Sequence, residues 1–284
     1  MYKSLNTGNV NIKTNGFEQT LALAHKYGFG AVSYSPDSLK SEGIDIFEAL
    51  DLMGQYGVII SDFGLPVQIK SKNEFNETFY LLESAARAAS KLGIRRCCTW
   101  MLSFSDDLEY AENFKRHKDM FRLIAEVLKE YDILFGVEFL GPKTILHSGK
   151  YPFIHTLEQL MELCDAVGTG NMGVLLDAHH CYSSGLKGGD FVKHIRNERE
   201  IVLVHLNDTA PGIPIDEIKD FPRYYPGEPG GGGNDLRGFM SALKQIKYTG
   251  PVIAEPFSET LKNMSDNEQI AKIISDSINS VMQD

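Results

Sequence analysis

The sequence predicts an α/β fold in which strand–helix units close into a (β/α)8 barrel. Short apolar runs alternate with longer amphipathic segments along the whole chain, which is typical of a parallel sheet covered by helices. Several of the apolar runs are continuous, as expected of strands that are buried on both faces. Eight units of roughly 35 residues use nearly all of the 284 residues, so we expect one domain spanning residues 1–284.

The expected strands are runs of apolar and β-branched residues between turn signals. A weak first run lies at residues 4–6. The stronger runs lie at residues 31–35, 58–65, 96–102, 134–140, 173–177, 201–207 and 252–256. Together they supply the eight strands that close this kind of barrel.

The segments between these strands have the composition and apolar stripes of helices. They lie at residues 17–27, 44–56, 73–92, 114–131, 156–167, 234–246 and 266–282, and only the one at 191–198 is short. Thr156 and Gln159 have the spacing of a capping box at the start of one of them. Glycines that would end a helix precede four strands, at Gly28, Gly57, Gly93 and Gly250.

An open, doubly wound sheet is the alternative arrangement of the same elements. That fold favours a GxGxxG turn directly after a strand. Here Gly28 and Gly30 follow a helical segment, so a simple turn explains them better. No linker rich in serine or proline divides the chain. The closed barrel is therefore the predicted fold.

Composition restricts the classes of partner. The chain has 38 acidic and 28 basic residues, and its net charge of −10 opposes a nucleic-acid groove. We expect no membrane span, because every apolar run is shorter than the ~18–20 residues needed. The start MYKSLNTGNV lacks the apolar core of a secretory signal. The cysteines form no CxxC pair, which predicts reduced, buried thiols in a cytoplasmic protein, at Cys97, Cys98, Cys164 and Cys181.

Polar residues end four consecutive apolar strands. They are Glu138, Asp177, His205 and Glu255. We expect them to converge, because the carboxyl ends of all strands meet at one mouth of a barrel. Three carboxylates and an imidazole there would repel one another without a divalent cation. This ligand set suits Mn²⁺ or Mg²⁺ and can accept Zn²⁺, Co²⁺ or Fe²⁺. One such residue alone would be explained equally well as a helix cap or a salt-bridge partner.

Further candidates surround these four. His180 lies three residues beyond Asp177, where it can reach a substrate hydroxyl. Arg223 either fixes a hydroxyl or an anionic group or is a solvated loop residue. Trp100 either stacks on a sugar face or belongs to the core, and Lys143 or His147 can face the mouth. The glycine-rich segment 227–233 either cradles a phosphate through backbone N–H groups or forms a flexible lid.

Four motifs resemble those of a known superfamily. They are GVEFLGP at 136–142, GVLLDAHH at 173–180, VHLNDT at 204–209, and the segment from YPGEPGGGG to PVIAEPF at 225–257. With these motifs the chain is similar to the sugar phosphate isomerase/epimerase superfamily of xylose-isomerase-like TIM barrels. The similarity covers most of the chain and is strongest from Phe135 onward. Within the superfamily it is greatest to the inosose (2-keto-myo-inositol) isomerase branch.

The resemblance implies one divalent metal ion, with Mn²⁺ favoured, held by Glu138, Asp177, His205 and Glu255. It also implies that Glu138 and Glu255 act as acid and base and that His180 and Arg223 contact the substrate. Two departures bear on specificity. The loop GPKTILHSG after Glu138 lacks the second glutamate of the ketose 3-epimerases, and the glycine run at 230–233 is longer than the usual Pro-Gly-x-Gly.

These features predict a metal-dependent isomerase or epimerase that acts on a keto-sugar or keto-cyclitol through an enediolate. A lyase or dehydratase on a related inosose or keto-glycoside stays open, with His147 or His180 as the acid. A sugar-binding barrel without catalysis is a third alternative. A nuclease resembling endonuclease IV would need more histidines and a basic face. We expect a small-molecule substrate, no nucleic-acid or membrane partner, and leave open whether the chain forms a homo-oligomer.

Overall fold

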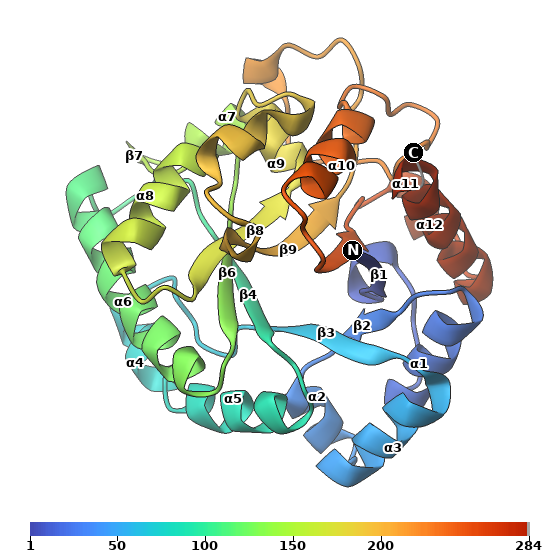
Figure 1. Cartoon of the computed structure of the whole chain (residues 1–284). Helices are drawn as coiled ribbons and strands as arrows, with labels where there is room; N and C mark the ends of the chain where they lie inside the picture. Colours follow the sequence, from blue (N-terminus) through green and yellow to red (C-terminus); the bar gives the residue numbers. More distant parts are fainter. Residues whose placement is uncertain (283–284) are drawn as a thin grey trace.

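Parallel strands in the described part of the chain close into a barrel (Figure 1). The computed structural model describes residues 1–282. Around the ring the strands follow the order β1, β10, β9, β8, β6, β4, β3, β2, so the first and last strands are neighbours. Their bounds are β1 Tyr2–Leu5, β2 Ala31–Ser33, β3 Ile59–Gly64, β4 Arg96–Met101, β6 Leu134–Phe139, β8 Met172–Asp177, β9 Ile201–Leu206 and β10 Pro251–Ala254. The predicted barrel is confirmed, and the open sheet is wrong.

Helices form the outer layer of the barrel (Figure 1). The longer ones are α1 Phe17–Lys26, α3 Ile46–Tyr56, α5 Leu81–Lys91, α6 Tyr110–Glu130, α8 Leu157–Val167, α10 Leu236–Gln245 and α12 Asn267–Met282. The shorter ones are α2 Pro36–Ser41, α4 Lys72–Thr78, α7 Lys143–Leu146, α9 Ala178–Ser183 and α11 Glu259–Lys262. None of the helices in residues 1–282 combines the length and the apolarity that crossing a bilayer requires.

Most of the expected helix signals operate as predicted. Gly28, Gly57 and Gly93 have positive φ angles of 69°, 64° and 77°, a conformation that ends a helix cheaply only at glycine. Before β10 the left-handed residue is Lys247 (φ 61°) and not Gly250. At α8 the hydroxyl of Thr156 accepts a bond from the Gln159 N–H, but the Gln159 side chain bonds the N–H of His155.

Three local expectations differ from the structure. The helix predicted at 73–92 is divided into α4 and α5 by a turn at residues 79–80. The segment near 191–198 forms a 3-10 helix, Gly188–His194. A small antiparallel pair, β5 Phe104–Ser105 with β7 Tyr151–Pro152, was not expected. Strands of two residues carry no periodic signal, so only their contact in the fold reveals them.

The barrel interior is filled by a small apolar cluster. It consists of Cys98, Leu175, Val202, Leu203 and Ile253. Gly136 of β6 faces this cluster, and a Cβ there would lie 2.9 Å from both Cys98 Sγ and Val202 Cβ. A larger core fills the space between the strands and the helices. All four cysteines are buried and free, as predicted.

Candidate active site

Four polar side chains meet at the carboxyl ends of neighbouring strands. Glu138 lies on β6, Asp177 ends β8, His205 lies on β9, and Glu255 follows β10. One ligand atom from each lies within 4.8 Å of the others. All four side chains are buried, with at most 9% of each residue exposed. The structure therefore brings together the four residues that the sequence singled out, and we call them the mouth cluster.

His205 lies at the centre of the mouth cluster. Its Nδ1 is 3.2 Å from Glu138 Oε1, 3.2 Å from Glu255 Oε2 and 4.0 Å from Asp177 Oδ2. Burial by itself lowers the pKa of His205, but the charges of Glu255 and Glu138 outweigh it and raise the pKa well above the usual value. The three acidic groups that converge on His205 therefore favour its protonated form when no cation is bound.

The environments of the two glutamates differ. Burial and the charge of Glu255 raise the pKa of Glu138, although the hydrogen bond from His205 opposes the shift. Burial also acts to raise the pKa of Glu255, but the positive charges of His205 and Arg223 outweigh it and the pKa is lowered. A pair of carboxyl groups with opposite shifts is typical of sites that use one as an acid and the other as a base.

Asp177 is held by two bonds that leave it fixed at the cluster. Its Oδ1 accepts a bond of 2.8 Å from the His180 N–H and so caps α9. Its Oδ2 accepts a bond of 2.7 Å from Asn207 Nδ2, which also donates to the Glu255 carbonyl at 3.2 Å. Asn207 was not predicted. Its place in the strand-end motif VHLNDT was the available signal.

Arg223 connects the mouth cluster to the loop beyond β9. It is 2% exposed, and its Nη1 donates to Glu255 Oε2 at 2.8 Å and lies 3.5 Å from Asp177 Oδ2. Its Nη2 donates to Asp220 Oδ1 at 2.5 Å and to His180 Nε2 at 3.1 Å. Arg223 is therefore no solvated loop arginine. Its nitrogens orient two carboxylates, with Asp220 as an anchor that the sequence did not indicate.

The other predicted substrate contacts separate into two groups. His180 is fully buried beside Arg223 and close to the cluster. Trp100 is 54% exposed on β4, where it pairs with Glu138 in register, and it borders a pocket of about 480 Å³ beyond β3 and β4. His147 is exposed after α7 and lies outside the mouth cluster. Lys143 forms an ion pair with Asp216 at 2.6 Å.

The glycine-rich segment 227–233 packs against the loop after β9. The N–H groups of Gly231, Gly232 and Gly233 donate to Glu228 O, Asp208 Oδ2 and Thr209 O. A Cβ at Gly233 would lie 2.7 Å from the Ala210 carbonyl oxygen, so the backbones approach closely because there is no side chain. These three amides are occupied by protein acceptors. The phosphate-cradle and flexible-lid interpretations are therefore both unsupported by this packing.

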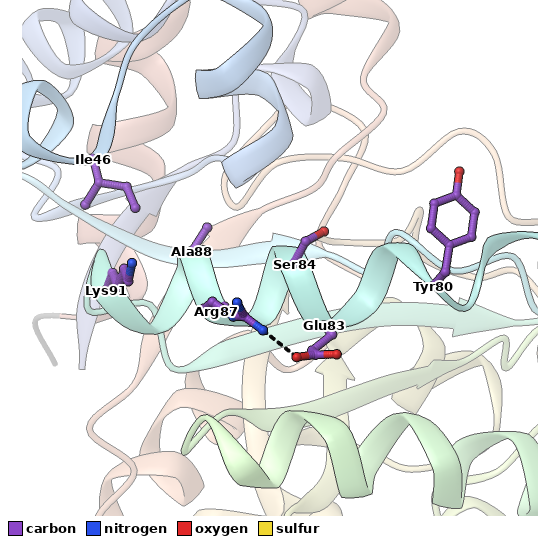
Figure 2. A pocket seen from close by; sticks show the side chains of 7 residues that line it. All are labelled: Ile46, Tyr80, Glu83, Ser84, Arg87, Ala88 and Lys91. Carbon is purple, nitrogen blue, oxygen red and sulfur yellow. Dashed lines mark hydrogen bonds and ion pairs between the residues drawn. The ribbon is translucent and has the colours of Figure 1, made fainter.

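Two other features of the molecule lie outside the mouth cluster, a second group of ligand atoms and a surface pocket. His179, His180 and Asp220 also bring three ligand atoms within 4.8 Å, but the Arg223 guanidinium bonds two of them and disfavours a cation. A surface pocket of about 370 Å³ lies in the outer layer between Ile46 of α3 and residues of α5. Figure 2 shows it, with an ion pair between Arg87 and Glu83. No member of the mouth cluster lines it.

The family follows from the sequence match. Residues 21–280 match the family model described as the xylose isomerase-like TIM barrel. The chain belongs to this family. The predicted resemblance to the xylose-isomerase-like barrels is confirmed.

Three curated relatives are similar over parts of the chain. An inosose isomerase of Halalkalibacterium halodurans is 29% identical over 147 residues, which are 52% of this chain and 48% of that protein. An inosose isomerase of Bacillus velezensis is 22% identical over 269 residues, 91% of this chain and 90% of that protein. A 3-dehydroshikimate dehydratase of Pseudomonas aeruginosa is 31% identical over 107 residues, 37% of this chain and 16% of that protein. The match to the first relative thus spans about half of its length.

Two solved structures share the whole fold. A xylose isomerase domain protein from Alicyclobacillus acidocaldarius has a TM-score of 0.86 and 25% identity, covering 100% of this chain and 98% of the other. The IOLI protein, in a crystal structure described as containing a binding zinc atom, has a TM-score of 0.81 and 20% identity, with the same coverage of 100% and 98%. The second likeness concerns the fold alone.

Proposed function

We propose that the chain is a divalent-metal-dependent isomerase or epimerase that acts on a keto-sugar or keto-cyclitol through an enediolate. One observation carries the proposal. The ligand atoms of Glu138, Asp177, His205 and Glu255 converge within 4.8 Å at the mouth of a xylose isomerase-like barrel. The inosose isomerases among the relatives supply the substrate class, a ring with a carbonyl beside a hydroxyl-bearing carbon.

The donor set fits a divalent cation. Three carboxylates and one imidazole suit Mn²⁺, which we favour, and also Mg²⁺, Zn²⁺, Co²⁺ or Fe²⁺. Hydrogen bonds from residues outside the cluster orient two of the ligands. Asn207 and the His180 N–H donate to Asp177, and Arg223 donates to Glu255. When bound, the cation would stabilise the negative charge that develops on the substrate carbonyl oxygen.

The two glutamates supply the proton transfer. Glu138 and Glu255 lie on β6 and β10, on either side of His205. One carboxylate removes the proton from the carbon next to the carbonyl, and the C–H electron pair passes into the enediolate. The other carboxyl group returns a proton to the same carbon or to its neighbour, giving epimerisation or aldose–ketose exchange. Transfer of this kind contributes about 10²–10⁴-fold to the rate.

Solvent deuterium exchange tests the roles of the glutamates. The protein is incubated in D₂O with Mn²⁺ and 2-keto-myo-inositol, D-fructose or a 3-keto-glucoside. We expect deuterium incorporation by the native protein and a loss of at least ~10²-fold in Glu138→Gln and in Glu255→Gln. Glu83→Gln on α5 removes a carboxylate from the outer layer and serves as the matched control.

Two results would contradict this proposal. Undiminished exchange in both glutamine variants removes the two-carboxylate mechanism. A product with an ultraviolet-absorbing enone, formed without exchange back into substrate, moves the assignment to a lyase. The dehydratase relative is the observation that keeps this second candidate open.

A further inference from the structure

The wall of the barrel opposite the mouth cluster carries a second buried acid. Asp62 of β3 is 7% exposed. In the closed ring β3 and β9 stand on opposite sides, so Asp62 faces His205 across the interior. The charge of His205 acts on Asp62, although burial is the larger influence and raises the pKa of Asp62 overall.

A β-bulge directs Asp62 into the interior. Val32 pairs with Ile60, but the next residue of β2, Ser33, pairs with Asp62, so Ser61 is an extra residue on β3. Ile60 and Phe63 pack in the outer core. Between them, Ser61 and Asp62 both face inward, because their side chains meet hydroxyls from β1 and β2 on the concave face of the sheet. A regular strand would have turned one of the two outward.

The partners of Asp62 are serine hydroxyls, which leave one of its oxygens available. Oδ1 accepts bonds from Ser61 Oγ at 2.5 Å and from Ser33 Oγ at 2.8 Å. Ser61 is itself joined to Ser4 of β1 by a bond of 2.7 Å. The bonds found for Asp62 among the described residues all go to Oδ1 and none to the other oxygen, Oδ2, and the residue as a whole is 7% exposed. Burying a carboxylate is costly, and the charges of His205 and Arg96 offset only part of that cost, because the pKa of Asp62 stays raised.

We propose that Asp62 binds a hydroxyl group on the side of the substrate far from the mouth cluster and thereby selects neutral polyols over phosphorylated or carboxylated sugars. An ionised carboxylate only accepts hydrogen bonds, so a hydroxyl donor satisfies Oδ2. An anionic group at the same place would meet a fixed negative charge in a poorly solvated site. This inference rests on the proposed function, because it assigns the orientation of a substrate whose carbonyl lies at the mouth cluster.

The interior polarity agrees with this orientation. Below the cluster, β4, β8, β9 and β10 contribute the apolar group of Cys98, Leu175, Val202, Leu203 and Ile253. Arg96 of β4, whose Nε donates to the Val202 carbonyl, adds one positive charge that acts on Asp62. The inward residues of β1, β2 and β3 include Ser4, Ser33 and Asp62. In the glycine-rich loop that would have been the phosphate site, the amides of Gly231, Gly232 and Gly233 are engaged by protein acceptors. A polyol ring would therefore find hydrogen-bond partners for its hydroxyl groups on β1, β2 and β3. A phosphate group would find no free amides at Gly231, Gly232 and Gly233.

Kinetics on a matched pair of probes test the inference. D-fructose and D-fructose 6-phosphate differ only in the anionic group, and 2-keto-myo-inositol supplies a neutral cyclitol. For the native protein we expect kcat/KM for exchange to be at least roughly tenfold higher for the neutral ketose than for its phosphate. In Asp62→Asn we expect KM for the neutral probe to rise roughly tenfold, with kcat within about threefold, and the preference against the phosphate to shrink. Asp51→Asn on α3 removes an exposed carboxylate and the same charge, and should leave both values unchanged.

Several outcomes would overturn the inference while leaving the proposed function in place. One is a higher kcat/KM of the native protein for the phosphorylated ketose than for the neutral one. This outcome can be measured without any variant. Another is an Asp62→Asn protein that folds and keeps the native KM and probe preference. If Asp62→Asn does not fold, Ser33→Ala removes one donor to Oδ1 and should raise KM severalfold, and an unchanged KM there counts against the role. Absence of exchange by the native protein on every probe would instead contradict the proposed function.

Discussion

At the scale of single residues, hydrogen bonds from neighbouring side chains fix the charged groups of the site in place. Asp177 caps α9 with one oxygen and meets Asn207 with the other. Arg223 binds Glu255 and Asp220. Because these bonds fix the carboxylates before any ligand arrives, little reorganisation is needed when charge develops in the reaction. The same logic applies to Asp62, whose two serine donors fix its direction.

A buried histidine outside the site makes stability depend on pH. His117 of α6 packs against Phe121 and Phe153, and its Nδ1 donates to the Asn113 carbonyl. Burial lowers its pKa from 6.5 to about 4. Between these values the unfolded chain binds a proton that the folded chain does not, so stability is lost as the pH falls from about 6.5 to about 4.

Replacing His117 by phenylalanine should remove this part of the acid sensitivity. Phenylalanine keeps the ring packing but cannot titrate. From pH 7 to pH 4.5, the free energy of unfolding of His117→Phe should improve relative to the native protein by about 2–3 kcal/mol. Urea denaturation at a series of pH values measures this difference. Parallel pH profiles for the two proteins would show that His117 does not lose its proton on folding.

At the scale of elements, glycine positions decide how closely the strands and helices approach. Gly136 lies inside the barrel against Cys98 and Val202. Gly173 of β8 comes so close to the next segment that a Cβ would lie 2.3 Å from the Glu200 carbonyl oxygen. Gly54 differs, because it lies within α3 and a Cβ there would meet nothing within 4 Å.

Two alanine substitutions should therefore have opposite signs. Gly136→Ala overpacks the barrel interior and should lower the free energy of unfolding by about 1–3 kcal/mol. Gly54→Ala reduces the backbone entropy of the unfolded chain and should raise it by about 0.5–1 kcal/mol. Chemical denaturation of both variants measures these changes side by side. A stabilised Gly136→Ala protein would mean that the interior can accommodate the methyl group.

At the scale of the whole molecule, the mouth cluster connects opposite ends of the chain. β1 pairs with β10, so closing the barrel joins the first residues to the segment that carries Glu255. A ligand that binds only the assembled cluster then stabilises the entire fold by mass action. The net charge of −10 also favours the approach of cations over anions.

Metal addition should accordingly raise the melting temperature. At a Mn²⁺ concentration 100- to 1,000-fold above Kd, the free energy of unfolding should rise by about 3–4 kcal/mol. A chelator should reverse this stabilisation. Asp177→Asn weakens a ligand within the cluster and should reduce the shift, whereas Glu83→Gln on α5 should preserve it. Thermal melts with and without the metal provide the readout. Equal shifts in both variants would place the cation outside the mouth cluster.

The sequence alone determined the fold class and the strand ends that matter. Continuous apolar runs define the strands, and their shared direction brings Glu138, Asp177, His205 and Glu255 to one mouth. The apolar runs recur in every unit and the polar ends in four consecutive units, so both are visible in the sequence without knowledge of the tertiary contacts. The roles of these residues as metal ligands and catalysts, and those of His180, Arg223, Trp100 and His147 toward the substrate, stay predictions.

Only the tertiary structure decided which polar groups face one another. The bulge at Ser61 shifts the register by one residue and turns Asp62 inward, a change that leaves no trace in the periodicity of the strand. The partners of Arg223 and the contacts of the glycine-rich loop join residues that are far apart in sequence or have no side chain. Such contacts depend on how the strands and loops pack in three dimensions, and the sequence pattern records only which residues are buried.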